Sequence, residues 1–458
     1  MAVVGRTHRP VLEPELCQSC RVCLRECPAE TFEDFRHDPE TVRGYLYGRT
    51  ELEQLQDLPP CQAACPLGQR VRDYVGLIRQ GKPKEAILLI RRDNPLPGVC
   101  GYVCSKPCEG ACLRGSWEEP VAIRELKRFA AHYEMEHRSE ILEVLKGWKA
   151  PERGKGVLVV GAGPSGLACS YELLMRGFRV TVLDALEEPG GMLRAGIPPF
   201  RLPREVIDHD VGMLLELGME FRGAVRVGDG VPLEELKGEA DAVVLAVGTW
   251  RDLKLGVPGE EAEGYLGCLE FLGGVNLGGS RDLRGRVLVI GGGNAALDAA
   301  RTALRLGPEE VLILYRRRLE DMPAQREEVE AALKEGVQIV PQVVPKGVVV
   351  EGGRVKGLEL LRVELGEPDP TGRPKPVPVE GSEFVEPADW VICAIGQGPE
   401  LRLLSGEDDA IRCDDWGRVL GYEGVFAAGD VVTGPSTVVE AMASGRAVAR
   451  RVAEFLEG

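Results

Sequence analysis

Residues 157–166 read Val-Leu-Val-Val-Gly-Ala-Gly-Pro-Ser-Gly, an apolar run that ends in three spaced glycines. The run has the length of a buried strand, and a helical pattern follows Gly161, Gly163 and Gly166. A second apolar strand, residues 179–183, ends in Asp184, an acid at about 20 residues' distance. The glycines allow a tight turn, close approach of a pyrophosphate and helix packing, and the acid accepts hydrogen bonds from a ribose. The stretch therefore predicts a Rossmann-type unit that binds a dinucleotide.

A second glycine-rich turn follows at residues 287–296, Val-Leu-Val-Ile-Gly-Gly-Gly-Asn-Ala-Ala. Its nucleotide-binding positions are expected to be Gly291, Gly293, Asn294 and Ala296. The next strand, 311–314, ends in Tyr-Arg-Arg-Arg rather than in an acid. A guanidinium pairs with a 2′-phosphate that a carboxylate would repel, so NADP is expected over NAD, bound by Arg316 and Arg317. The alternative for these arginines is a solvated basic turn.

A third strand, residues 424–430, ends in Gly429-Asp430, and a helix is expected from about Ser436 to Val448. Because this strand follows two nucleotide motifs, we expect it to return the chain to the first nucleotide domain. Asp430 would then hydrogen-bond the ribityl or pyrophosphate region of a flavin. The following helix would direct the positive end of its dipole towards the flavin ring.

Ten of the 14 cysteines lie within the first 112 residues: Cys17, Cys20, Cys23, Cys27, Cys61, Cys65, Cys100, Cys104, Cys108 and Cys112. The first four, followed by a proline, have the spacing of bacterial iron–sulfur ligation. Structural zinc is an alternative, but it usually takes two separated pairs and often histidine, and the five histidines are scattered. A disulfide framework suits short secreted chains, and no basic and apolar signal segment opens this one. We therefore expect the front of the chain to carry electrons.

Size and charge limit the function classes. A chain of 458 residues is expected to form about three domains. The net charge of −16 has the wrong sign for binding nucleic acid or an anionic membrane. The most apolar stretch, 157–175, is interrupted by glycines, a proline and Glu172, so no membrane span is expected. The missing signal segment and the need for reduced thiols predict a cytoplasmic protein.

The predicted fold class is α/β, with two Rossmann-like domains preceded by a helical iron–sulfur domain. Helices are expected at 71–78, 85–92 and 123–133, and a linker at 148–156. The expected domains are a cysteine-rich extension (1–50), the helical iron–sulfur domain (51–150), an FAD domain in two parts (151–255 and 391–458) and an inserted NADPH domain (256–390).

Several longer motifs indicate a family. They are Cys61-Gln-Ala-Ala-Cys65-Pro66, residues 94–104 (NPLPGVCGYVC), Cys108-Glu-Gly-Ala-Cys112, residues 196–203 (GIPPFRLP), residues 315–324 (YRRRLEDMPA) and Gly429-Asp430. With them, residues 61–458 resemble the glutamate synthase small subunit and its relatives, among them the N-terminal half of dihydropyrimidine dehydrogenase and the large subunit of NADH-dependent ferredoxin:NADP oxidoreductase. The resemblance implies FAD, NADPH, two 4Fe–4S clusters and a partner subunit. It also places Gly191 and Arg201 near the flavin, where the alternative is a plain structural loop.

Two positions depart from the family pattern. A Cys-x2-Cys pair expected just ahead of Cys61 is replaced by Glu53 and Gln56. The helix that carries a Gln or Glu cluster ligand in the family has Lys127 there, and an ammonium cannot ligate iron. We hypothesise that the segment 17–27 compensates, either by sharing a cluster with Cys61 and Cys112 or by building an additional, third cluster. Cys100 is then free to complete a cluster on Cys65, Cys104 and Cys108.

No catalytic side chain is expected, because the cofactors supply the chemistry. The isolated Cys169, Cys268, Cys393 and Cys413 are interpreted as small core residues, which disfavours a redox dithiol beside the flavin. The leading function is an electron-transfer subunit that moves electrons between NADPH, FAD and 4Fe–4S clusters, to or from a partner such as a glutamate synthase large subunit. One alternative is a subunit of an electron-bifurcating complex with ferredoxin and NAD-linked partners. The other is an assembly subunit with vestigial nucleotide sites.

Overall fold

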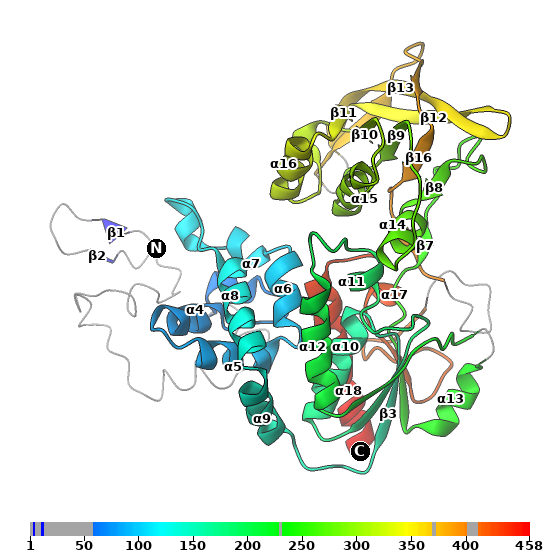
Figure 1. The fold of residues 1–458 in the computed structure, drawn as a ribbon. Coiled ribbons are helices and arrows are strands. Elements are labelled where there is room, and N and C mark those ends of the chain that lie inside the picture. The colour runs from blue at the N-terminus through cyan, green and yellow to red at the C-terminus, as the bar shows by residue number, and fades with distance from the viewer. Residues whose placement is uncertain (1–2, 5–10, 13–57, 229–230, 369–371, 401–410) are drawn as a thin grey trace. The chain divides into compact units, whose positions relative to one another are not determined.

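The computed structural model describes residues 3–4, 11–12, 58–228, 231–368, 372–400 and 411–458. Two compact units are present: residues 1–148 with 438–443, and residues 149–437 with 444–458 (Figure 1). The expected cluster ligands Cys17, Cys20, Cys23 and Cys27 lie outside the described residues. Ahead of residue 58 the described strands are β1 (Val3–Val4) and β2 (Val11–Leu12), which pair antiparallel.

The first unit is helical over residues 58–148. Its elements are α3 (Pro60–Ala63), α4 (Val71–Arg79), α5 (Pro83–Asp93), α6 (Pro97–Val103), α7 (Pro107–Gly110), the 3₁₀ turn η3 (Leu113–Ser116), α8 (Ile123–Glu136) and α9 (Arg138–Trp148). Four of these helices begin with proline, whose missing N–H and fixed φ suit the first helical position. Helices expected at 71–78, 85–92 and 123–133 are present as α4, α5 and α8.

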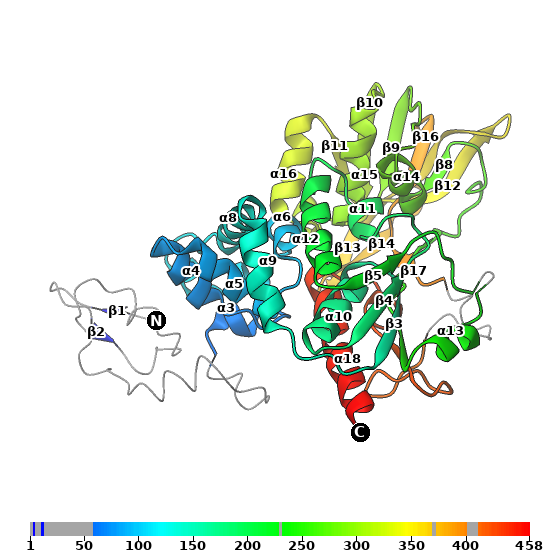
Figure 2. The ribbon, with the colours of Figure 1, turned by 60° about the horizontal axis from the view of Figure 1, so that its bottom comes forward.

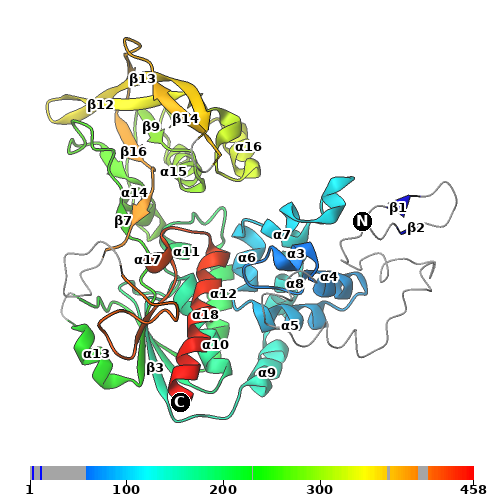
Figure 3. The same ribbon diagram turned by 180° about the vertical axis from the view of Figure 1, so that it is seen from behind.

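The second unit contains a parallel sheet in the strand order β18-β6-β3-β4-β5. Its strands are β3 (Gly156–Val160), β4 (Arg179–Leu183), β5 (Met219–Arg222), β6 (Ala242–Leu245) and β18 (Val425–Ala427). Helices α10 (Pro164–Met175) and α12 (Arg204–Glu216) cover one face beside residues 444–457 of α18 (Val438–Glu457), and α13 (Leu233–Glu239) lies on the other (Figure 3). Strands covered on both faces read as continuous apolar runs, as residues 157–160 do.

A second parallel sheet of the same unit has the order β11-β10-β9-β16-β8. Its strands are β8 (Tyr265–Gly267), β9 (Arg286–Ile290), β10 (Glu310–Tyr315), β11 (Gln338–Pro341) and β16 (Trp390–Cys393). Helices α14 (Cys268–Asn276), α15 (Asn294–Arg305) and α16 (Arg326–Glu335) pack on one face (Figure 2). An antiparallel sheet of β12 (Val343–Glu351), β13 (Arg354–Pro368), β14 (Pro374–Pro378) and β15 (Phe384–Pro387) packs on the other.

The chain passes between the two sheets at a short ladder. Strand β7 (Arg251–Asp252) leaves the first sheet, β17 (Gln397–Gly398) returns to it, and the two pair antiparallel. The second sheet is therefore inserted into the first domain, and the predicted fold class is confirmed. Because β16 belongs to the second sheet, the chain returns slightly later than the expected boundary at residue 390. Among the described helices, none has the length and apolar character needed to cross a membrane.

Candidate functional site

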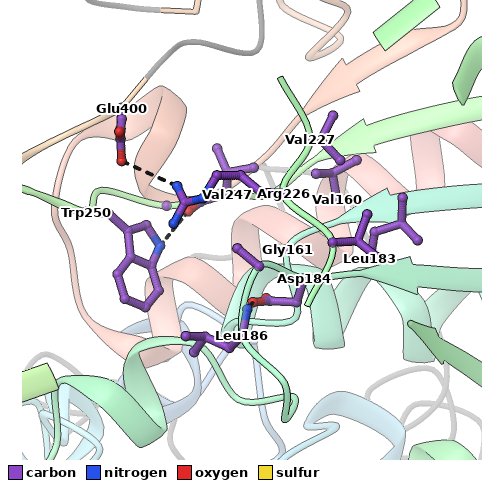
Figure 4. Close-up of a pocket in the computed structure, with 13 residues that line it drawn as sticks. Val160, Gly161, Leu183, Asp184, Leu186, Arg226, Val227, Val247, Trp250 and Glu400 are labelled. Atoms are coloured by element: carbon purple, nitrogen blue, oxygen red, sulfur yellow. Dashed lines mark hydrogen bonds and ion pairs between the residues drawn. The ribbon is translucent and has the colours of Figure 1, made fainter. Parts of the chain in front are cut away.

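A cavity of about 260 Å³ lies at the carboxyl ends of the first sheet's strands (Figure 4). Its lining includes Gly161 after β3, Asp184 after β4, and Val247 and Trp250 after β6. Open parallel sheets bind ligands at this edge, where the strand order changes direction. The cavity therefore combines the first glycine turn and the terminal acid that the sequence predicts.

Each glycine of the first turn lies where the nucleotide-binding pattern calls for a residue without a side chain. Gly161 has φ +109°, and a Cβ there would lie 2.3 Å from the carbonyl oxygen of Ala246. A Cβ at Gly166 would lie 1.8 Å from the carbonyl oxygen of Gly161, so α10 can pack here only without a side chain. A Cβ at Gly163 would meet nothing within 4 Å. This open space at the start of α10 fits a pyrophosphate at a helix N-terminus.

The carboxylate of Asp184 accepts hydrogen bonds from the backbone at and near the first glycine turn. Its Oδ2 accepts a hydrogen bond from the backbone N–H of Ala162 at 2.6 Å, and its Oδ1 accepts one from Leu186 at 2.8 Å. Burial raises the pKa of Asp184 despite these two bonds. Each carboxylate oxygen can accept a further bond, so the acid can still bind a ribose hydroxyl.

Three side chains near the cavity were not singled out from the sequence. Trp250 lies beside it, and its Nε1 donates to the carbonyl oxygen of Val247 at 2.9 Å. Arg226 and Glu400 also line the cavity, with 3.7 Å between guanidinium and carboxylate (Figure 4). All three lie on loops, where no periodic pattern marks a residue as functional.

Two distant segments meet the first glycine turn, as expected. Gly191 has φ +53°, and a Cβ there would lie 2.8 Å from the Cα of Gly163. Gly429 has φ +77°, and a Cβ there would lie 2.7 Å from the Cβ of Ser165. Asp430 begins the short helix α17 (Asp430–Thr433), and the hydroxyl of Ser436 donates to its Oδ1 at 2.6 Å. The structure thus brings Gly191, Gly429 and Asp430 to one place, while their roles toward a flavin stay predictions.

Arg201 faces the inserted domain. Its Nη1 donates to Asp298 of α15 at 2.6 Å, and its Nε lies 3.1 Å from Glu328 of α16. The pair with Asp298 is almost fully buried, with 7% and 5% of the two side chains exposed. The described contacts of Arg201 are therefore to carboxylates of the second nucleotide-binding fold, and its flavin contact stays a prediction.

The second glycine turn repeats the geometry of the first. Gly291 has φ +145°, and a Cβ there would lie 2.3 Å from the carbonyl oxygen of Ala394. A Cβ at Gly293 would meet nothing within 4 Å, which leaves the same opening at the start of α15. Ala296 is fully buried in the core at the third position. The Oδ1 of Asn294 accepts from the backbone N–H of Gln325 at 3.0 Å, which joins this turn to α16.

The arginines after β10 differ in their surroundings. Arg317 is buried, with 3% of its surface exposed, and its Nε donates to the carbonyl oxygen of Pro374 at 2.6 Å. Arg318 is exposed and its Nε pairs with Asp321 at 2.9 Å. Arg316 is exposed. Arg316 is therefore the better placed of the two expected ligands for a 2′-phosphate, while Arg317 anchors strand β14.

A buried ion pair ties the C-terminal helix to the first glycine helix. The Nε and Nη2 of Arg446 lie 3.0 and 2.9 Å from Oε2 of Glu172 on α10. Arg450 adds a bond to Oε1 at 3.2 Å. Burial alone would raise the pKa of Glu172, but the two arginines hold that pKa below its usual value.

The six described cysteines of the helical unit fall into two groups by burial. Cys65, Cys100, Cys104 and Cys108 are buried, and Cys61 and Cys112 are half-buried. They form no disulfide with one another. No three of them hold their sulfurs within 4.8 Å of one another, whereas a tetrahedral zinc with bonds of about 2.3 Å would need a closer set. Their chemistry fits iron–sulfur clusters, which thiolates ligate.

The thiols and the lysine of this cysteine group shift one another's pKa values. The hydrogen bond from Cys100 lowers the pKa of Cys104 to about 6. The same hydrogen bond raises the pKa of Cys100, and burial raises it further. Burial raises the pKa of Cys108 to about 12. Lys127 is 3% exposed, and although burial opposes its charge, Tyr74 and the neighbouring thiols keep its pKa above the usual value. An ammonium thus lies at the position where the resemblance implies an oxygen ligand.

Family comparisons agree with both units. Residues 155–445 match the model of the pyridine nucleotide-disulphide oxidoreductases. The chain belongs to this family. Residues 56–139 match the 4Fe–4S cluster model known as dihydropyrimidine dehydrogenase domain II.

Curated relatives carry the same combination. The chain is 36% identical to the glutamate synthase [NADPH] small chain of Escherichia coli, over 87% of this chain and 89% of the relative. It is 37% identical to the NADPH-Fe(3+) oxidoreductase subunit beta of Geobacter sulfurreducens, over 96% and 70%. It is 40% identical to the NADP(+)-dependent formate dehydrogenase subunit beta of Moorella thermoacetica, over 87% of this chain but only 60% of that protein.

Among solved structures, FprA of Mycobacterium tuberculosis in complex with NADPH matches with a TM-score of 0.60 at 22% identity, over 67% of this chain and 85% of that one. This likeness supports the fold. The family models and the curated relatives confirm the prediction of an FAD- and NADP-dependent oxidoreductase with a 4Fe–4S domain. The expected resemblance to the glutamate synthase small subunit is also confirmed. The number of clusters and the role of each named residue stay predictions.

Proposed function

We propose that this chain is the NADPH-oxidising electron-transfer subunit of a larger oxidoreductase. When bound, FAD would accept a hydride from NADPH and pass electrons singly to 4Fe–4S clusters. The observation that carries the proposal is the pair of matching glycine turns, each with an open position at a helix start, within one unit of the chain. Both turns keep the geometry that nucleotide binding needs, which argues against vestigial sites.

The chain's own residues would divide the work as follows. Gly163 and the N-terminus of α10 would bind the FAD pyrophosphate, and Asp184 would orient the ribose. Gly293 and the N-terminus of α15 would hold the NADPH pyrophosphate, with Arg316 on the 2′-phosphate. The cysteines of the helical unit would ligate the clusters.

The partner is a second oxidoreductase subunit. Supporting this, the relatives described above are named as beta or small subunits. Their printed activities differ, so the partner here would be of glutamate synthase, formate dehydrogenase or Fe(III) reductase type. A bifurcating partner with ferredoxin remains the alternative. We place the complex in the cytoplasm, where thiolate ligands stay reduced.

Anaerobic addition of NADPH to the purified, reconstituted full chain tests the core of this proposal. We expect flavin absorbance near 450 nm to bleach and cluster signals to develop in electron paramagnetic resonance (EPR) spectra. NADH should act much more weakly. A chain that binds FAD but shows no bleaching with either nucleotide would refute the function.

Copurification from the native host identifies the partner. Glutamine-dependent, formate-dependent and Fe(III)-dependent turnover of NADP(H) by the isolated complex would distinguish the three partner types. Bleaching without any copurified oxidoreductase subunit would refute the partner but leave the NADPH reaction standing.

A further inference from the structure

The buried cysteines of the helical unit have one buried cation as a shared electrostatic neighbour. Cys65, Cys100, Cys104 and Cys108 expose at most 9% of their surfaces. The ammonium of Lys127 interacts electrostatically with Cys65, Cys100 and Cys104, and it is the main neighbouring charge acting on Cys108. Cys61 and Cys112 are only half-buried.

Close packing of two helices creates this arrangement. A Cβ at Gly101 of α6 would lie 2.8 Å from the Cα of Arg128 on α8. Only a glycine permits this approach, since Cβ atoms essentially never come so close to backbone. Cys100 directly precedes Gly101 and Lys127 directly precedes Arg128, so the contact brings the backbone at these two residues close together.

Two further donors reach the sulfurs. Gln69 is fully buried, and its Nε2 donates to the sulfur of Cys65 at 3.7 Å. The backbone N–H of Lys106 donates to the sulfur of Cys104 at 3.4 Å. Hydrogen bonds to ligand sulfurs are among the factors that set cluster potentials. The Oε1 of Gln69 and the hydroxyl of Tyr74 are buried and have no hydrogen-bond partner within the described part of the chain, so both are competing oxygen ligands.

We propose that Cys65, Cys100, Cys104 and Cys108 ligate one 4Fe–4S cluster through four thiolates, with Lys127 as a non-ligating positioning cation and Gln69 as a hydrogen-bond donor to Cys65. This assignment rests on the proposed function. Each thiol releases its proton when it binds iron. The four thiolates leave the buried cluster negative, and a buried charge needs a compensating one nearby. Lys127 supplies that charge, because its ammonium has no lone pair for iron.

The ligand set is tested by iron and sulfide quantitation and EPR on the anaerobically reconstituted full chain. Cys100→Ser and Cys100→Ala should each lose the iron of one cluster and its signal, as should Cys108→Ser. Gln69→Leu and Tyr74→Phe should each retain the iron. The matched control is Cys268→Ser, a buried cysteine of the second unit. Wild-type iron and signal in either soluble Cys100 variant would overturn the assignment, as would lost iron in Gln69→Leu or Tyr74→Phe.

The role of Lys127 is tested by potentiometric titration of the cluster. Lys127→Met should lower the ratio of reduced to oxidised cluster at a fixed potential at least tenfold, about 59 mV for a one-electron couple. Lys127→Arg should restore most of it, and the exposed Lys146→Met on α9 should change nothing. Equal midpoints in wild type and Lys127→Met would overturn the role. In wild-type chain carrying ¹⁵N-lysine, a directly bonded nitrogen coupling would overturn non-ligation without any variant.

Flavin bleaching by NADPH in these variants separates the two proposals. Cys100 or Cys108 variants that bleach normally and keep all their iron would refute only the ligand assignment. A wild-type chain that does not bleach refutes the proposed function.

Discussion

Alanine substitutions at Gly163 and Gly166 should affect different properties of the protein, although the two glycines belong to one turn. Gly163 has φ −77° and ψ −177°, a conformation open to alanine, and its Cβ would enter open space. At Gly166 the new Cβ would lie 1.8 Å from the carbonyl oxygen of Gly161 and 3.3 Å from a methyl of Val159. The first change should therefore affect the ligand and the second the fold.

The structure sets the size of each effect. Real Cβ contacts essentially never fall below 3.0 Å, so Gly166→Ala must shift backbone by more than 1 Å. Overpacking against backbone should cost about 3 kcal/mol or more. Gly163→Ala should change the stability of the apoprotein by no more than about 0.5 kcal/mol. Because its methyl group occupies the approach of the pyrophosphate, FAD affinity should fall at least about tenfold, or about 1.4 kcal/mol.

Thermal unfolding of the FAD-stripped chains and FAD titration of each protein measure the two quantities separately. Gly163→Ala should unfold like the wild type and bind FAD weakly, while Gly166→Ala should unfold at a clearly lower temperature. A stable Gly166→Ala chain, or a Gly163→Ala chain with wild-type FAD affinity, would show that the turn does not work as described.

Four further substitutions test the nucleotide domains. Arg316→Glu should raise the KM for NADPH far more than the KM for NADH. Arg317→Glu should mainly lower the unfolding temperature, because that side chain is buried. Equal effects of the two variants in steady-state kinetics and in melting curves would contradict this difference. Glu172→Gln should cost about 3–5 kcal/mol by stranding Arg446. Since the pKa of Glu172 is lowered from 4.5, its contribution is present near neutrality and lost on acidification, so the variant and wild type should converge in denaturation at low pH. Asp184→Asn should weaken FAD binding, measurable by the same titration, and unchanged affinity would argue against ribose recognition.

The glycine turns could be predicted because their chemistry is local: two or three residues of spacing determine both the turn and the helix that follows. The choice between Arg316 and Arg317 could not, because neighbouring side chains of an extended segment point to opposite sides. The sequence places both at the strand end, and only the packing of β14 shows which one is exposed. Likewise, Glu172 interrupts an apolar stretch in the sequence, but its partner Arg446 is 274 residues away.

The antiparallel sheet β12–β15 was not anticipated at all. Its strands carry prolines and irregular register, with shifts near Pro345 and Val349, so no clean alternation marks them. For the cysteines, spacing predicts which residues bind iron but not how deeply each one lies. The burial that separates Cys100 from Cys112 depends on the contact of α6 with α8, which no spacing rule contains.

The two-residue ladder of β7 and β17 brings the two ends of the inserted domain together. Asp252 pairs with Gln397, so the inserted domain enters and leaves at almost one point. A domain whose ends lie side by side can be gained, lost or exchanged in evolution without reordering its host. Residues 253–396 are thus a transferable cassette. Protein engineers could replace it with another nicotinamide-binding domain, and so change the electron donor while leaving the flavin turn and the cysteine helices as they are.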